Sequence, residues 1–214
     1  DQLSISAELK SSGVPIIFSK SLTCAPRERG EKVVLRDPLE VAAGVQLVLQ
    51  DLAILAPITL QAGATLQMHR CFLEADGDAL VMKAGARAEL LQVRGRGVVR
   101  VNGAKSRPAS LVVRDTQWQG FEGAGVLLDQ GEFDAQGFEL DGAGVAAEGG
   151  KLEIRASAIR APLKDGLKLW GAVKAQVDDL TISDCQEVGF LVQGNARLEA
   201  SRCRVTGSLK NSLW

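Results

Sequence analysis

The chain has 214 residues and a formal net charge of −1, from 25 basic and 26 acidic side chains. Hydrophobic residues make up 46% of it, but aromatic residues only 4%, and there are 23 glycines and no tyrosine. A near-zero net charge supplies no long-range field for nucleic acid or an anionic membrane surface, so neither partner is expected. A core built from small aliphatic side chains suits a thin, repetitive architecture better than a bulky globular one.

No segment approaches the roughly 20 consecutive apolar residues of a membrane-spanning helix. Residues 1–10 also lack the basic and then apolar plan of a secretory signal. We therefore expect a soluble chain without membrane insertion, and its compartment is not indicated. The first residue is Asp1 rather than methionine, which is compatible with a processed product.

The residues that most often bind metals are few and far apart. His69 is the single histidine, and no two of the four cysteines have the spacing of a zinc knuckle; they are Cys24, Cys71, Cys185 and Cys203. We expect no metal and no cofactor. An even number of cysteines permits two disulfides in an oxidising compartment, but small buried thiols in a reduced protein are the favoured interpretation.

The first forty residues are less regular than the rest. Residues 3–9 alternate between apolar and polar, residues 16–18 form a short apolar run, and residues 33–35 follow a polar stretch. An open end of a stacked-repeat protein must be covered. We therefore interpret residues 1–40 as irregular early coils or an N-terminal cap.

From Val41 onward a repeated unit organises the chain. Four copies begin with glycine, alternate apolar and variable residues, and close on glycine; they are residues 125–131, 144–150, 166–171 and 189–194. The small residues that close successive units are Gly44, Gly63, Gly85, Pro108, Gly131, Gly150, Gly171 and Gly194. The mean interval is about 21 residues, which lies in the range of stacked structural repeats.

Alternation within each unit predicts strands, because a period of two places every second side chain on one face. Inward positions are expected at residues 64, 66 and 68, 111 and 113, 152 and 154, 173, 175 and 177, and 196, 198 and 200. A third apolar pair follows in most units, for example Leu52 with Ile54 and Leu180 with Ile182. Three strands per unit predict an all-β, single-stranded right-handed parallel β-helix of about eight or more coils over residues 41–205, with residues 206–214 as a C-terminal tail.

This repeat resembles those of the pectate-lyase-like superfamily of parallel β-helices. The similarity is best in residues 189–205, which contain Gly-Asn-Ala-Arg-Leu-Glu-Ala-Ser-Arg-Cys-Arg-Val, and in residues 63–73, Gly-Ala-Thr-Leu-Gln-Met-His-Arg-Cys-Phe-Leu. These coils look most like the non-enzymatic members, such as the β-helix regions of F-box and scaffold proteins that bind other polypeptides. The resemblance implies a structural or protein-interaction module, including an accessory subunit of a larger assembly.

A carbohydrate-active enzyme or a polysaccharide-binding protein is the alternative. Pectin hydrolases of this superfamily resemble one another in Asn-Thr-Asp, Asp-Asp, His-Gly and Arg-Ile-Lys signatures, and only Asp178-Asp179 matches one of them. Two carboxylates can cleave a glycoside when held about 5–9.5 Å apart on one face. Adjacent strand residues point to opposite faces, so Asp178 and Asp179 are weak catalytic candidates and a polar turn is favoured.

Two other sets of residues are candidates for partner binding. The aromatic side chains Trp118, Phe121, Trp170 and Trp214 could anchor an interface, with sugar stacking and local packing as alternatives. Glu122, Asp141, Asp165 and Glu187 each precede a strand by two or three residues, which predicts an acidic row at one corner of consecutive coils. That row could bind cations or a basic partner, but a solvated turn is favoured because carboxylates one coil apart repel each other.

Overall fold

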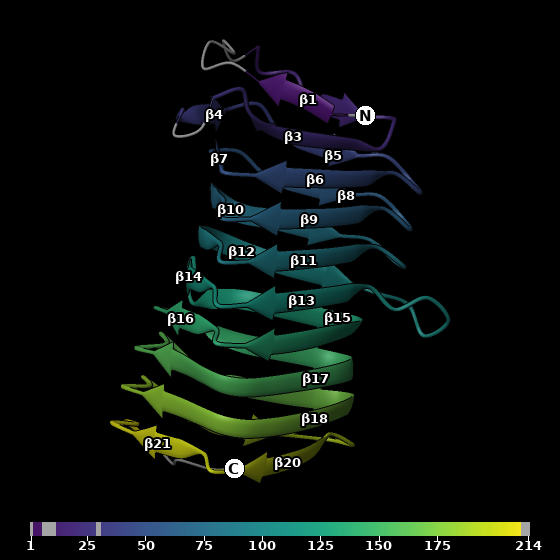
Figure 1. Cartoon of the computed structure of the whole chain (residues 1–214). Coiled ribbons are helices and arrows are strands. Elements are labelled where there is room, and N and C mark those ends of the chain that lie inside the picture. Colours follow the sequence, from purple (N-terminus) through teal and green to yellow (C-terminus); the bar gives the residue numbers. More distant parts are fainter. Residues whose placement is uncertain (1, 6–11, 29–30, 211–214) are drawn as a thin grey trace.

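The computed structural model describes residues 2–5, 12–28 and 31–210. The chain is an all-β parallel solenoid of about nine turns, about 22 residues apart (Figure 1). In the described part no helix is long and apolar enough to cross a membrane. The predicted fold class is confirmed.

Each turn contributes to three parallel faces. Face 1 contains β1 (Gln2–Ile5), β3 (Leu22–Pro26), β6 (Gln46–Gln50), β9 (Thr65–His69), β11 (Arg87–Leu91), β13 (Ser110–Arg114), the end of β15 (Ala124–Gln136), the middle of β17 (Gly144–Arg160) and of β18 (Leu167–Ser183), and β20 (Arg197–Ser201). Face 2 contains β4 (Val33–Leu35), β7 (Leu52–Ile54), the start of β10 (Phe72–Met82) and of β12 (Arg94–Asn102), β14 (Gln117–Gln119), β16 (Glu139–Asp141), the ends of β17 and β18, and β21 (Arg204–Thr206).

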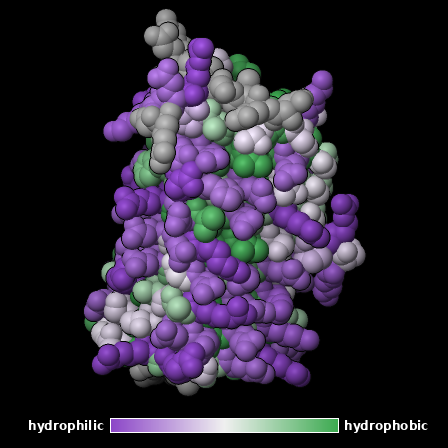
Figure 2. All heavy atoms as spheres, in the orientation of Figure 1, coloured by the Kyte–Doolittle hydropathy of each residue, from purple (hydrophilic) through white to green (hydrophobic). Residues whose placement is uncertain are grey.

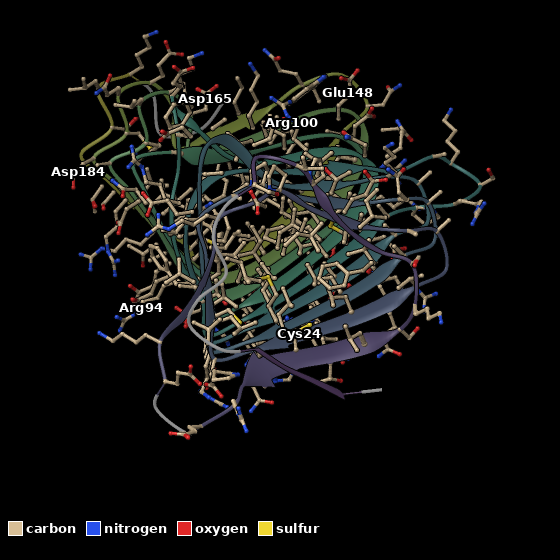
Figure 3. All side chains as sticks on the ribbon, turned by 90° about the horizontal axis from the view of Figure 1, so that it is seen from above. Cys24, Arg94, Arg100, Glu148, Asp165 and Asp184 are labelled. Atoms are coloured by element: carbon tan, nitrogen blue, oxygen red, sulfur yellow. The ribbon has the colours of Figure 1, made fainter. Side chains whose placement is uncertain are left out.

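Face 3 completes the turn and lies behind face 1 in Figure 1. It contains β2 (Ile16–Phe18), β5 (Leu39–Val41), β8 (Ile58–Leu60), the ends of β10 and β12, the starts of β15, β17 and β18, and β19 (Phe190–Val192). Viewed along the axis, the strands enclose the core: Cys24 lies inside the ring, whereas Arg94 and Glu148 lie outside it (Figure 3).

The core consists of rows of side chains that stack in register from coil to coil. One row on face 1 is Leu47, Leu66, Ala88, Leu111, Phe133, Leu152, Ala175 and Leu198. All but the last are buried, and the inward positions predicted from alternation are confirmed in every coil except the one that ends the described stack. Apolar burial of about 25 cal/mol per Å² along such rows stabilises the solenoid without a bulky centre.

The corners require unusual backbone conformations. Between faces 3 and 1, glycines adopt positive φ angles of 67° to 90° in six coils: Gly44, Gly63, Gly85, Gly150, Gly171 and Gly194. Between faces 1 and 2, each of eight coils turns on a single residue with φ between 45° and 64°: Asp51, Arg70, Gln92, Asp115, Gly137, Ala156, Asp179 and Arg202. Seven of these eight carry a side chain, so the fold accepts a cost of about 1–2 kcal/mol at each such corner.

When the residue after the corner between faces 1 and 2 has a polar side chain, that side chain donates a hydrogen bond to the backbone carbonyl two residues earlier. Thr116 Oγ1 donates to the carbonyl of Arg114 at 3.0 Å, and Ser157 Oγ donates to the carbonyl of Arg155 at 2.7 Å. The Cys71 and Cys203 thiols make the same contact two residues back, at 3.4 and 3.2 Å. Among the described residues, no buried side-chain nitrogen or oxygen lacks a hydrogen-bond partner.

The chain before Val41 continues the same three faces. β1 pairs with β3, β2 with β5 and β4 with β7, all in parallel register. The buried Asp37 carboxylate holds the segment that enters β2, accepting hydrogen bonds from the Ser12 amide at 2.9 Å and the Gly13 amide at 2.7 Å. A carboxylate that receives several backbone N–H groups is a strong local anchor.

Candidate functional site

A groove of about 640 Å³ lies on the outer side of face 1. It crosses β9, β11 and β13 and ends near β15, beside the loop that projects between β12 and β13 in Figure 1. Its lining is Thr65, Leu66, Gln67, Gly85, Arg87, Ala88, Glu89, Arg107, Pro108, Ser110, Val112 and Glu132. Figure 2 shows that this side of the molecule is mostly hydrophilic, with small hydrophobic spots along its middle.

The projecting loop, residues 103–109, positions Arg107 at the groove. The Arg107 amide donates to the Ala104 carbonyl at 2.9 Å, and the Ala104 amide donates to the Arg107 carbonyl at 3.2 Å, which closes a tight turn. The Arg107 carbonyl also accepts from the Gly85 amide at 3.0 Å, which ties the loop to the preceding coil. The backbone of Arg107 therefore fixes the turn, and its exposed guanidinium makes none of these bonds.

Two glycine corners make room for this guanidinium. A Cβ atom at Gly85 would lie 3.3 Å from Nε of Arg107, and one at Gly63 would lie 3.4 Å from an Nη atom. The side chain therefore rests across the corners of the two preceding coils. This contact places a planar cation along one wall of the groove before any ligand is present.

Arg87 stands on the groove floor between short neighbours. In the parallel register its partners on the adjacent strands are Thr65 and Ser110, and Ser110 is followed by Glu132. In the described part of the chain, neither Arg87 nor Arg107 has a carboxylate within 4.0 Å. The two cations are thus available to an outside group.

The groove continues toward the C-terminal coils as a smaller hollow of about 210 Å³, which shares Ser110, Val112 and Glu132. Here the charges are paired: Arg114 contacts Asp134 at 2.5 Å, and Glu153 contacts both Lys151 and Arg155. The Glu153 hydrogen bond raises the pKa of Lys151. The N-terminal half of the groove therefore has two arginines without an ion pair to any described residue, whereas the carboxylates of the C-terminal half are mostly neutralised by Arg114, Lys151 and Arg155.

Ion pairs between neighbouring coils account for many of the remaining charges. Asp51 receives two hydrogen bonds from Arg70, at 2.7 and 2.8 Å, which raise the pKa of that guanidinium. Similar pairs join Arg100 to Asp78 at 2.6 Å and Arg160 to Glu139 at 3.0 Å. Such exposed pairs contribute little to stability, because water and salt screen the attraction between the charges.

Asp178 and Asp179 do not converge. Asp178 points outward from face 1, where it accepts from Ser201 Oγ at 2.6 Å and contacts Arg202. Asp179 occupies the next corner with φ of 56° and is exposed. Asp179 thus lies at an exposed corner rather than on the inner face of a strand.

The predicted aromatic group is spread through the molecule. Trp118 is a correction: it is 3% exposed and its Nε1 donates to the Gly97 carbonyl at 2.8 Å, so it is a core residue rather than a surface anchor. Trp170 is half-buried on face 3 with Lys168 Nζ 5.6 Å from its ring, and Phe121 lies in the turn before β15. Trp214 is outside the described residues.

The acidic row at one corner is also a correction. Asp141 is the last residue of the face 2 strand β16, whereas the other three follow face 2, and the coil registers do not align them. Asp141 pairs with Arg160, and the Glu187 amide bonds to the Lys164 carbonyl. Asp165 is 8% exposed and accepts from the Val188 amide at 3.3 Å, while Glu122 lies in the turn before β15. Corner loops of different length shifted the side chains relative to their sequence spacing.

The four thiols are separate in the structure, and all are free. Burial raises the pKa of Cys24, Cys71 and Cys185 to about 11, which keeps them protonated near neutral pH. Within residues 2–5, 12–28 and 31–210, no group of three or more His, Cys, Asp or Glu side chains could hold a metal ion.

No motif in the sequence marked Arg87 and Arg107 as site residues. Pro108 was interpreted only as the boundary of a repeat unit. The preceding residues 103–107, Gly-Ala-Lys-Ser-Arg, were the indication of a loop that would carry Arg107. Comparison with protein-family models, curated proteins and solved structures found no match for this chain.

Proposed function

We propose that this protein is a non-catalytic structural or protein-interaction module that docks a partner polypeptide along face 1, including the role of an accessory subunit in a larger assembly. The observation that carries the proposal is the groove of about 640 Å³ that crosses successive coils and contains two arginines without an ion pair to any described residue. The resemblance of residues 189–205 to non-enzymatic members of the pectate-lyase-like superfamily supports it.

The solenoid suits such a role physically. Each coil bonds its strands to both neighbours over most of the chain, so the face presents side chains on a stiff frame that loses little entropy on binding. Binding surfaces on stacked repeats extend over several units, and no single unit has to carry the whole site.

The test is crosslinking and mass spectrometry in the native source, with two matched surface variants. Val112→Arg places a bulky charge on the groove floor, whereas Gln119→Arg places the same side chain on the outside of face 2. We expect a protein partner that crosslinks beside the groove, that is lost with Val112→Arg and that is retained with Gln119→Arg.

The alternative, a carbohydrate-active enzyme, has its own readout. Purified protein is incubated with polygalacturonate and other acidic glycans, and new reducing or unsaturated ends are measured. Cleavage by the wild-type protein, abolished by Asp178→Asn, would overturn the proposal. If Val112→Arg and Gln119→Arg retain the protein partner equally, the partner does not bind to face 1.

A further inference from the structure

We propose that the N-terminal half of the groove recognises an acidic side chain of an extended polypeptide, bound between Arg87 and Arg107. This inference rests on the proposed function and specifies the chemistry of its partner. It starts from the donors that surround this half of the groove: two guanidinium groups and the hydroxyl groups of Thr65 and Ser110.

The arrangement of these donors fits a carboxylate. A guanidinium group offers a planar fork of N–H groups that matches the two oxygens of a carboxylate, and charge-assisted hydrogen bonds of this kind are the stronger ones. Arg107 is already placed at the groove, because the turn of residues 103–109 fixes its backbone and its side chain lies across the glycine corners.

The nearest acid does not fill the site. Glu89 lines the same groove, but its carboxylate accepts a hydrogen bond from Gln67 Nε2 at 3.3 Å and makes no ion pair with either arginine. Glu132 lies two strands beyond Arg87 in the same outward row, which corresponds to roughly 10 Å at the usual strand spacing. Beyond Glu132 the same row continues with Lys151, and Asp134 is paired with Arg114, so the unpaired cations of the groove lie in its N-terminal half.

The confinement of the unpaired cations to one half of the groove favours a polypeptide over an acidic glycan. A glycan with a carboxylate on every sugar would find no further unpaired cation in the described part of the groove after the arginines, because Asp134 already holds Arg114 and Glu153 already holds Lys151 and Arg155. A polypeptide can place an acidic residue at the arginines and a neutral or basic one farther along. The lining also lacks an exposed aromatic ring on which a sugar could stack.

The probe is a fluorescein-labelled peptide with the sequence Ala-Ser-Ala-Glu-Ala-Ser-Ala, which offers one acidic side chain with neutral residues on either side of it. Its binding is measured by fluorescence anisotropy against the full chain at low salt. The matched probe has glutamine in place of the glutamate, and an unlabelled galacturonate hexamer serves as competitor.

We expect the wild-type protein to bind the glutamate peptide and not the glutamine peptide, with affinity that falls as salt is added. Arg87→Gln and Arg107→Gln should each weaken binding roughly tenfold, or about 1.4 kcal/mol. Arg94→Gln removes an exposed arginine from face 2 and should change the affinity less than twofold. Thermal unfolding verifies that each variant is folded, because the structural bonds of Arg107 come from its backbone.

Three results would overturn the inference: no binding of the glutamate peptide, an equal loss in the Arg94→Gln control, or tighter binding of the galacturonate hexamer. These are distinct from failure of the proposed function. If the protein partner is lost with Val112→Arg but the glutamate peptide does not bind, face 1 is still the docking face. Only the inference that it recognises an acidic side chain is then wrong.

Discussion

The indole ring of Trp118 fills the space that Gly95 leaves open on the neighbouring strand of face 2. The two residues are register partners, and a Cβ atom built at Gly95 would lie 2.2 Å from Cζ3 of Trp118. The ring is held in that space by its Nε1 hydrogen bond to the Gly97 carbonyl. The largest side chain in this part of the core therefore depends on the absence of a side chain one coil away.

Gly95→Ala is expected to destabilise the protein by about 3 kcal/mol, because overpacking of a filled core forces side chains or backbone to move. Urea unfolding followed by tryptophan fluorescence and circular dichroism measures the loss. A second change, Trp118→Leu, should cost less in the Gly95→Ala background than in the wild type, since the added methyl then has room. Additive effects of the two substitutions would contradict the packing relationship.

Ala156→Gly is expected to raise the free energy of unfolding by about 1 kcal/mol. Ala156 is exposed and has a φ of 45°, a conformation that is strained for residues with a Cβ atom and free for glycine. Ala158→Gly is the matched control: this residue lies within the strand, where glycine should lower stability by about 0.5–1 kcal/mol. Chemical denaturation of the two variants should give shifts of opposite sign.

Asp37→Ala is expected to release the entry to β2 without unfolding the rest of the solenoid. It removes the acceptor of the Ser12 and Gly13 amides, and hydrogen bonds to charged groups contribute about 1.5–3 kcal/mol each. Hydrogen exchange should accelerate at residues 12–18 and remain unchanged in β13 and β17. Uniform acceleration throughout the chain would instead indicate that Asp37 supports the whole fold.

The protein should lose stability as pH rises from about 9 to about 11. Burial raises the pKa of Cys24, Cys71 and Cys185 to about 11, from an ordinary value of 9.0, so the folded state binds these protons more tightly than the unfolded state. This contribution is fully present below pH 9 and is lost as pH passes through 11. Urea midpoints recorded across this range measure it.

Valine at Cys24 provides the comparison, because it keeps an apolar side chain in the core and removes one ionisable group. The variant should show a shallower decline between pH 9 and 11 than the wild type. The titration of exposed lysines is common to both proteins and cancels in the difference. Identical slopes would mean that the Cys24 thiol does not contribute to the alkaline loss.

Most of the solenoid could be predicted from local sequence. Alternation such as Leu66 with Met68 identifies inward positions, and glycines such as Gly63 and Gly85 mark corners where only a residue without a Cβ turns freely. Both signals arise within a few residues of one another, and the period of about 21 residues repeats them. The architecture of a regular stack of coils can therefore be predicted from the repeats in its sequence.

The positions of the candidate site residues depend on contacts between side chains of different coils, and these contacts cannot be predicted from local sequence. Trp118 was expected on the surface, but the neighbouring Gly95 provides an interior space that its own segment does not indicate. Asp165 was expected in an acidic row, but an irregular loop turned it inward against Val188. The sequence by itself determined which residues form strands and corners. Only the tertiary structure decided which side chains from different coils meet. The reason is that corner loops differ in length, so a loop such as the one that contains Arg107 places its side chains against coils that the repeat spacing does not predict.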